Sequence, residues 1–177
     1  MWDIRRAAAC LLSFDQHNSD SGALADTNKA HGAGVNGLVC DGSRLVSLGL
    51  DEKLRLWDAY TGRNTLVNYG SLWRNRFQWH MEAAVSGPDV WPPLLYVPSD
   101  DQQVLVYELN TGRLSRRLKG AYGRVTAVEK RSGLQELYCA SFDSEILVYE
   151  PSESHRAVEE DDHPSEVCAK ASYFSRG

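Results

Sequence analysis

The sequence has little that would suit a metal protein or a membrane protein. It contains four cysteines, Cys10, Cys40, Cys139 and Cys168, with no Cys-x-x-Cys spacing and no histidine cluster near them, which argues against a zinc site. No apolar run approaches the ~20 residues of a membrane-spanning helix, so we expect no membrane partner. Cysteines of this kind are typical of a reducing compartment, and we expect free thiols in a nuclear or cytosolic protein.

Basic charge and catalytic motifs are also scarce. The 177 residues include 19 lysines and arginines against 24 aspartates and glutamates, a net charge of −5. Because a nucleic-acid-binding domain normally needs a basic face, we expect no direct sequence-specific binding of nucleic acid. The sequence contains no Gly-x-Ser-x-Gly, phosphate-binding loop, His-Glu-x-x-His or kinase signature. We therefore expect no enzyme activity and no cofactor.

The sequence does contain an internal repeat. Residues 48–58 are typical of a strand end, a tight turn at Asp51 and a second strand of alternating side chains that ends in Trp-Asp. The form Asp-x-x-apolar-x-apolar-aromatic-acid returns at residues 101–108 and 143–150. The pair Trp2-Asp3 is a fourth, shorter echo.

This repeat predicts the fold class. A period of about 40–50 residues with strands in each unit is the signature of WD-repeat propellers, in which Trp-Asp ends the third strand of a four-stranded blade. We predict an all-β fold, a WD-repeat β-propeller fragment of about three four-stranded blades. Propellers close a ring from roughly four to eight blades, so the chain is expected to be a piece of a larger ring that begins inside a repeat. The alternative is a small domain closed by self-assembly.

The predicted organisation is a partial propeller over residues 1–151 and a disordered acidic tail over residues 152–177. The first 14 residues would complete one repeat, and residues 15–30 would form a long surface loop. The three repeats are assigned to residues of about 31–70, 76–118 and 120–151.

Some strand assignments depend on weaker patterns. The outer strand of the first repeat is expected near residues 64–67, and the inner strand of the second repeat at residues 77–81. A proline-rich turn follows that inner strand and begins at Pro88. The strand at residues 145–150 is expected to be an unpaired edge, because no later segment is typical of the next strand of its blade.

One set of residues recurs with the repeat and is expected to be structural rather than catalytic. In WD repeats a histidine, a hydroxyl of the second strand, the turn aspartate and the tryptophan form a hydrogen-bonded set, which gives buried polar groups their partners. The hydroxyl position is predicted at Leu48, so the set is expected to be partial, and the third repeat has Ala121 where the histidine would stand. The structural repeat positions are His31, Asp51, Trp57, Asp101, Tyr107, Asp143 and Tyr149.

Candidate partner-binding residues lie near the first residue. Residues 2–5 fit the Trp-Asp-x-Arg form seen in WD-repeat proteins that dock on the adaptor of cullin-RING ubiquitin ligases. An arginine just past the third strand would lie at the rim of the blade, where its guanidinium can reach carbonyls or carboxylates of a partner. The alternative is an ordinary surface arginine. The candidate residues are Trp2, Asp3, Arg5 and Arg6.

Several stretches are more specific than the repeat itself. The most specific is Asn-Thr-Leu-Val-Asn-Tyr-Gly at residues 64–70, which is not a general WD-repeat sequence. The others are residues 2–7, Leu12 with residues 15–18, residues 30–31 with 35–38, residues 55–57, 118–120 and 135–138. In this order, from Trp2 to about Pro151, they resemble the C-terminal part of the Cockayne syndrome group A family of WD-repeat DNA excision repair factors.

That resemblance implies a function. It implies a substrate-receptor subunit of a cullin-RING ubiquitin ligase acting in transcription-coupled nucleotide excision repair, with a seven-bladed ring and a non-catalytic, protein-binding role. It further implies a nuclear location and three kinds of partner: the adaptor subunit of the ligase, stalled RNA polymerase II, and repair factors. Relative to the family, the chain is expected to lack the early blades and the main adaptor-docking segment. The alternative is a generic WD-repeat scaffold with unrelated partners.

Overall fold

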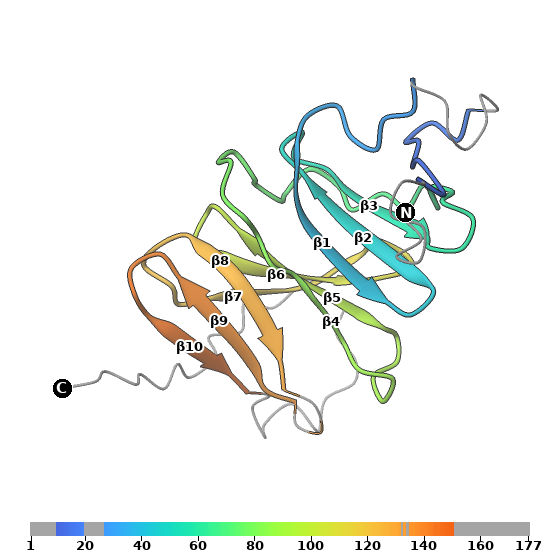
Figure 1. Cartoon of the computed structure of the whole chain (residues 1–177). Coiled ribbons are helices and arrows are strands. Elements are labelled where there is room, and N and C mark those ends of the chain that lie inside the picture. Colours follow the sequence, from blue (N-terminus) through green and yellow to red (C-terminus); the bar gives the residue numbers. More distant parts are fainter. Residues whose placement is uncertain (1–9, 20–26, 132, 134, 151–177) are drawn as a thin grey trace.

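The computed structural model describes residues 10–19, 27–131, 133 and 135–150, and these residues form ten β-strands and no helix (Figure 1). The strands lie in three antiparallel sheets. The first sheet contains β1 (Val35–Asp41), β2 (Arg44–Gly49) and β3 (Leu54–Asp58). The second contains β4 (Ala84–Val85), β5 (Leu94–Ser99), β6 (Gln103–Glu108) and β7 (Leu114–Lys119). The third contains β8 (Val125–Lys130), β9 (Leu137–Ser141) and β10 (Ile146–Tyr149).

The three sheets are arranged like neighbouring blades. The first sheet, blue to cyan in Figure 1, and the third, orange, flank the second, green to yellow. The innermost strand of the second sheet, β4, contacts both β1 and β8, and Glu82 just before it forms a parallel bridge with Ala127 of β8. Inner strands that meet in this way, with each sheet running outward from them, confirm the predicted partial propeller.

Two hydrophobic clusters fill the spaces between the sheets. One joins the first and second sheets around residues such as Leu48, Leu95 and Leu105, and the other joins the second and third sheets around Val104 and Leu147. Strand β6 lies between both clusters and is buried on both faces from its first residue to Tyr107. Its nearly continuous apolar sequence follows from that position. Burial of each such leucine contributes about 1.5–3 kcal/mol relative to exposure.

The turns after the second strand of each sheet share one backbone conformation. The residue that follows each repeated aspartate is left-handed, with φ of 56° at Glu52, 66° at Gln102 and 71° at Ser144. The two Thr-Gly turns also match, since Gly62 and Gly112 have φ of 69° and 73°. Their amides donate to the carbonyls of Asp58 and Glu108 respectively. The sequence repeat is therefore a repeat of backbone geometry.

The outer strand predicted near residues 64–67 is wrong. Only Asn64 bridges to Trp57, and Leu66 has a φ of 60°, which ends extended pairing. The Asn64 side chain accepts from the Leu66 amide and donates to the Gln16 carbonyl. A polar side chain that bonds to nearby backbone in this way competes with a sheet ladder.

The inner strand predicted at residues 77–81 is also wrong, because residues 77–79 form bends and the inner strand is β4. The side-chain amide of Asn36, in β1, lies 2.6 Å from the Trp79 carbonyl and 3.4 Å from that of Phe77, so these carbonyls bond to a side chain rather than to the backbone of a neighbouring strand. The turn predicted at Pro88 is present. Strand β10 is an edge of its sheet among the described residues, as predicted, whereas the predicted tail at residues 152–177 lies outside them.

Candidate protein-binding site

The first blade contains a complete hydrogen-bonded set. His31 Nδ1 lies 2.8 Å from Asp51 Oδ1, and His31 Nε2 lies 2.6 Å from Ser47 Oγ. Trp57 Nε1 donates to the same Ser47 oxygen at 2.8 Å. The prediction that the hydroxyl is missing is therefore wrong: it comes from Ser47, one residue before Leu48. Neighbouring residues of a strand point to opposite faces, so Leu48 faces the core and Ser47 faces the histidine.

The order Ser47, His31, Asp51 looks like a nucleophile, a base and an orienting acid. Its surroundings do not suit catalysis, because Ser47 is only 2% exposed and its oxygen already accepts the indole N–H of Trp57. A carboxylate can only accept, so Asp51 fixes the proton on His31 Nδ1 and Nε2 accepts from the Ser47 hydroxyl. Every polar atom of the set has a partner, and its role is to stabilise the blade.

The electrostatics of the set follow from burial and from Arg55. Burial lowers the pKa of His31, while contact with Asp51 acts in the opposite direction without reversing it. Burial raises the pKa of Asp51, but hydrogen bonds from His31, Gly32 and Arg55 outweigh it and leave the pKa lowered. Arg55 Nη1 lies 2.9 Å from Asp51 Oδ2, and its Nη2 donates to Gln16. At neutral pH the set thus holds a neutral imidazole beside an ion pair.

The second blade has lost most of this set. Val97 of β5 occupies the position that Ser47 has in the first blade, because it pairs with Leu105 in the same register in which Ser47 pairs with Arg55. A methyl group therefore stands where the first blade has a hydroxyl. The Tyr107 hydroxyl is buried without a hydrogen-bond partner, and burial raises its pKa to about 12. Asp101 is exposed and accepts from Gln103 in its own turn.

The third blade keeps a different part of the set. Asp143 is exposed and accepts from the Gly123 amide at 2.7 Å, which ties its turn to the segment before β8. Cys139 of β9 occupies the position of Ser47, and burial raises the pKa of its thiol to about 12. Tyr149, at the position of Trp57, is buried in the cluster between the second and third sheets. The repeat positions of all three blades therefore lie at turns or in the core rather than together in a cleft.

A cluster of aromatic side chains lies exposed at the turn end of the blades. We call Phe77, Trp79 and Phe142 the aromatic cluster; they are 52%, 60% and 64% exposed. The Arg124 guanidinium lies over both phenylalanine rings, 4.7 Å from the centroid of Phe77 and 4.9 Å from that of Phe142. The Trp79 and Phe142 ring centroids are 6.1 Å apart. Contiguous exposed apolar surface of this kind marks interaction sites in soluble proteins.

Buried polar residues hold the aromatic cluster in place. Asn75 is fully buried; its Nδ2 donates to the Gly49 carbonyl at 3.0 Å, and its amide exchanges two hydrogen bonds with the Asn36 amide. Asn36 in turn donates to the Trp79 carbonyl. Arg124 Nε lies 3.7 Å from Asp100 Oδ1, and both side chains are largely buried. These buried hydrogen bonds and the ion pair thus fix the backbone at Trp79 and the Arg124 side chain, on which the aromatic cluster packs.

Sequence reasoning missed the aromatic cluster. Two of its members were assigned to a strand that does not form, and Phe142 belongs to another repeat. The predicted partner-binding residues Trp2, Asp3, Arg5 and Arg6 lie outside the described residues. Among the residues that the structure describes, no helix is long and apolar enough to span a membrane, and no His, Cys, Asp and Glu side chains gather in a group that could hold a metal ion.

Comparison with known proteins supports the fold and suggests a relative. No family model matches the chain. The WD repeat-containing protein ATCSA-1 of Arabidopsis thaliana is 37% identical over 128 residues, which span 71% of this chain and 27% of the relative. The solved structure of U3-55K superposes with a TM-score of 0.57 at 20% identity, over 69% of this chain and 37% of that chain. A chain of the mitotic checkpoint complex superposes with a TM-score of 0.55 at 22% identity, over 70% and 38%.

The WD40 repeats of RRP9 give a similar result, with a TM-score of 0.55 at 20% identity over 69% of this chain and 37% of that chain. The chain thus spans only 27% of the curated relative and little more than a third of these solved chains. At such identities the solved structures show the fold alone. The repeats, the three packed sheets and the Arabidopsis relative support a place in the WD-repeat family, and the chain has the fold of a partial WD-repeat β-propeller.

Proposed function

We propose that the chain is part of a substrate-receptor subunit of a cullin-RING ubiquitin ligase that acts in transcription-coupled nucleotide excision repair. The observation that carries this proposal is the 37% identity to ATCSA-1, compared with 20–22% for propellers such as U3-55K and the checkpoint chain. A shared fold accounts for the lower values. The higher value, together with the resemblance of residues 64–70 to the Cockayne syndrome group A family, favours this receptor over a generic scaffold.

In this proposal the chain binds proteins and the ligase supplies the chemistry. WD-repeat relatives include components of protein complexes, such as the chain of the mitotic checkpoint complex. The aromatic cluster is the surface that suits this role, because aromatic residues are enriched at the buried centres of protein interfaces. Its supports, Asn36, Asn75 and Arg124, reduce the entropy that binding would otherwise cost.

The proposed partners are the ligase adaptor, RNA polymerase II stalled at a lesion, and repair factors, and the proposed location is the nucleus. The adaptor contact is assigned to Trp2, Asp3, Arg5 and Arg6 on the basis of the Trp-Asp-x-Arg form alone. The aromatic cluster then remains available to a second partner. A receptor needs two such separate contacts, one with the ligase and one with its target.

Affinity purification tests this proposal. The tagged protein is recovered from cells with and without ultraviolet irradiation, and co-purifying proteins are quantified against an unrelated WD-repeat bait. We expect the cullin, RING and adaptor subunits in both samples, and more RNA polymerase II after irradiation. Recovery of other complexes without any ligase subunit would contradict the proposal and favour the generic WD-repeat scaffold.

A further inference from the structure

Strand β10 has an occupied copy in the second sheet. Leu147 of β10 pairs with Cys139, and Leu105 of β6 pairs with Val97. Because Cys139 and Val97 hold the same position in their blades, β6 corresponds to β10 residue by residue. Strand β6 has a further strand, β7, on its outer side, whereas β10 is the outermost described strand of its sheet. The pair of β6 and β7 therefore shows what a strand beside β10 would contact.

The backbone of β10 offers hydrogen-bonding groups on its outer side. The Ser141 amide donates to the Glu145 carbonyl at 3.1 Å, so residue 145 bonds toward β9. The bonding direction alternates along an antiparallel strand, and Ile146 and Val148 therefore direct their amides and carbonyls away from β9. The corresponding residues of β6 pair with β7 on this side. Within the described part of the chain no strand pairs with β10 there, which leaves an edge that another strand can join.

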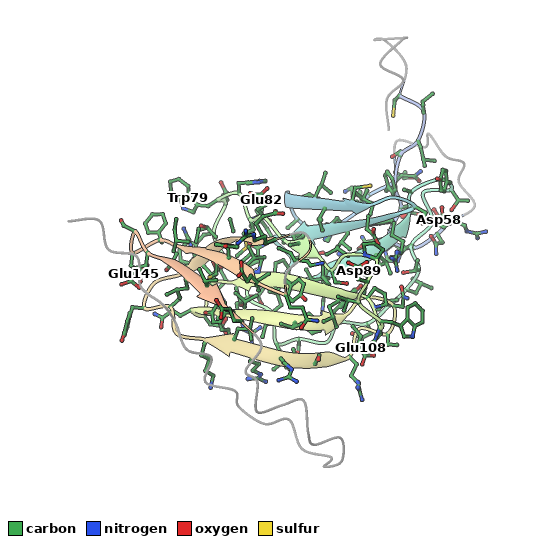
Figure 2. All side chains as sticks on the ribbon, turned by 90° about the horizontal axis from the view of Figure 1, so that it is seen from below. Asp58, Trp79, Glu82, Asp89, Glu108 and Glu145 are labelled. Atoms are coloured by element: carbon green, nitrogen blue, oxygen red, sulfur yellow. The ribbon has the colours of Figure 1, made fainter. Side chains whose placement is uncertain are left out.

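This edge lies at the margin of the described structure. Strand β10 is on the side away from the first sheet in Figure 1, and Glu145 just before it lies at the outline of the ribbon in Figure 2. Ile146 is 60% exposed, whereas Val104, at the same position in β6, is buried opposite Leu118 of β7. Val104 and Leu118 both pack in the cluster between the second and third sheets. An apolar residue opposite Ile146 would cover part of it in the same way.

Basic residues of the occupied copy lie opposite the positions that carboxylates hold in β10. Glu108 of β6, at the position of Glu150, forms an ion pair of 2.9 Å with Arg113 at the start of β7. Lys119 at the other end of β7 lies opposite the position that Glu145 has in β10. The occupied copy thus indicates a strand with a basic residue toward each end and an apolar residue within it.

A second copy of β10 does not meet this requirement. Residues 143–150 contain three carboxylates and no lysine or arginine. Two of the nearby basic residues already form ion pairs, Arg124 with Asp100 and Arg131 with Glu136. The other charged residues from the end of β7 to β10 are Lys119, Glu129 and Lys130. Two antiparallel copies of β10 would bring carboxylates together with no cation on either strand, which is destabilising.

We infer that the outer side of β10 binds an extended segment of a partner protein as a fourth, antiparallel strand. The segment has an apolar residue opposite Ile146 and basic residues that reach Glu145 and Glu150. Backbone hydrogen bonds to Ile146 and Val148 supply affinity, and the side chains select the sequence, as in other complexes formed by strand addition. The inference goes beyond the proposed function and does not depend on the ligase.

A peptide with the sequence of residues 113–119 tests the inference, because these residues fill the same place in the second sheet. The labelled peptide is titrated with the full chain by fluorescence anisotropy, and we expect saturable binding. A scrambled peptide keeps the charge but loses the pattern, and a peptide methylated on the amides of Arg116 and Leu118 cannot donate to β10. Each should bind about tenfold more weakly or worse.

Variants of the chain test the same contacts from the other side. Val148→Pro removes an amide that points away from β9, a place where an edge strand accepts proline. Ile146→Lys puts a positive charge on the edge. Each should weaken binding of the peptide by about tenfold or more. Trp91→Lys adds the same charge at a side chain that is 87% exposed in the loop before β5, and it should leave binding unchanged.

Several results would overturn the inference. One is the absence of binding, and another is equal binding of the scrambled peptide, which would show attraction by charge alone. A third is equal binding by wild type and Ile146→Lys when both unfold at the same temperature. Tighter binding after deletion of residues 151–177 would overturn it by assigning the edge to that segment of the chain. Self-association that Ile146→Lys abolishes in sedimentation would overturn it by assigning the edge to a second copy.

Discussion

His31 and Gly49 fit together only because Gly49 has no side chain. A Cβ added to Gly49 would lie 2.1 Å from His31 Nδ1 and 2.4 Å from Asp51 Oδ1, where no atom can be placed. Gly49 is the last residue of β2, and the last residues of β5 and β9 are Ser99 and Ser141. The third blade has Ala121 in place of the histidine. In the third blade, where the histidine is absent, Ser141 thus stands at the position of Gly49.

This relationship predicts a specific double-mutant result. Gly49→Ser should destabilise the chain by about 1–3 kcal/mol or more, because it overpacks a buried polar site. His31→Ala removes the ring that the new side chain would meet, so the double variant should be less destabilised than the sum of the single variants. Urea unfolding of all four proteins measures this coupling. Additive free energies would show that the two side chains do not compete for space.

The first and second blades should respond in opposite ways to the loss of a hydroxyl. Ser47→Ala leaves His31 Nε2 and Trp57 Nε1 buried without their partner, and it should cost about 1–3 kcal/mol of unfolding free energy. Tyr107→Phe removes a buried hydroxyl that has no partner, so it should be neutral or stabilising. Thermal unfolding compares the two. Equal losses would contradict the assignment of polar partners in these blades.

Acid should destabilise the first blade through His31 and Asp51. The pKa values of both groups are lower in the folded chain than their ordinary values of 6.5 and 3.8, so the unfolded chain takes up protons first as pH falls. The contribution of His31 is complete above about pH 6.5 and is lost below it, and that of Asp51 is lost below about pH 4. His31→Gln should reduce the slope of unfolding free energy between about pH 7 and about pH 5. An unchanged slope would exclude His31 as its source.

Arg5 is expected to act in partner binding rather than in stability. Arg5→Ala should reduce recovery of the ligase adaptor from cell extracts, while unfolding free energy stays within about ±0.5 kcal/mol of the wild type. Arg116→Ala, which removes an exposed arginine from β7, is the matched control. Adaptor recovery that is equal for both variants would leave Arg5 as an ordinary surface residue.

The repeat predicted the fold because its residues are spaced by backbone geometry. Alternating apolar residues, a tight turn and a closing aromatic residue have the same offsets in each blade, so one pattern predicts several strands. The hydrogen-bonded set was harder to predict from the sequence than the fold. The residue that supplies its hydroxyl had to be chosen within a strand whose neighbouring residues are similar. An error of one residue moved it from Ser47 to Leu48 and so to the opposite face of the strand.

The aromatic cluster could not be predicted from local patterns. Phe77 and Phe142 are brought together by Arg124, which lies far from Phe77 in the sequence and stacks on both rings. The period of alternating residues cannot show such a contact, since it describes one strand at a time. Phe77 and Trp79 also have high strand propensity, but Asn36 binds their carbonyls and keeps them out of a sheet.

Quantitative co-purification from irradiated cells tests the central claim most directly, with wild-type, Trp79→Ala and Trp91→Ala proteins as baits. If the chain is part of a ligase receptor that holds its targets on the aromatic cluster, the cullin and RING subunits should be recovered equally with all three. Repair partners should be lost with Trp79→Ala alone. The account would be contradicted if wild-type protein recovered no ligase subunit, or if Trp79→Ala and Trp91→Ala recovered the same repair partners.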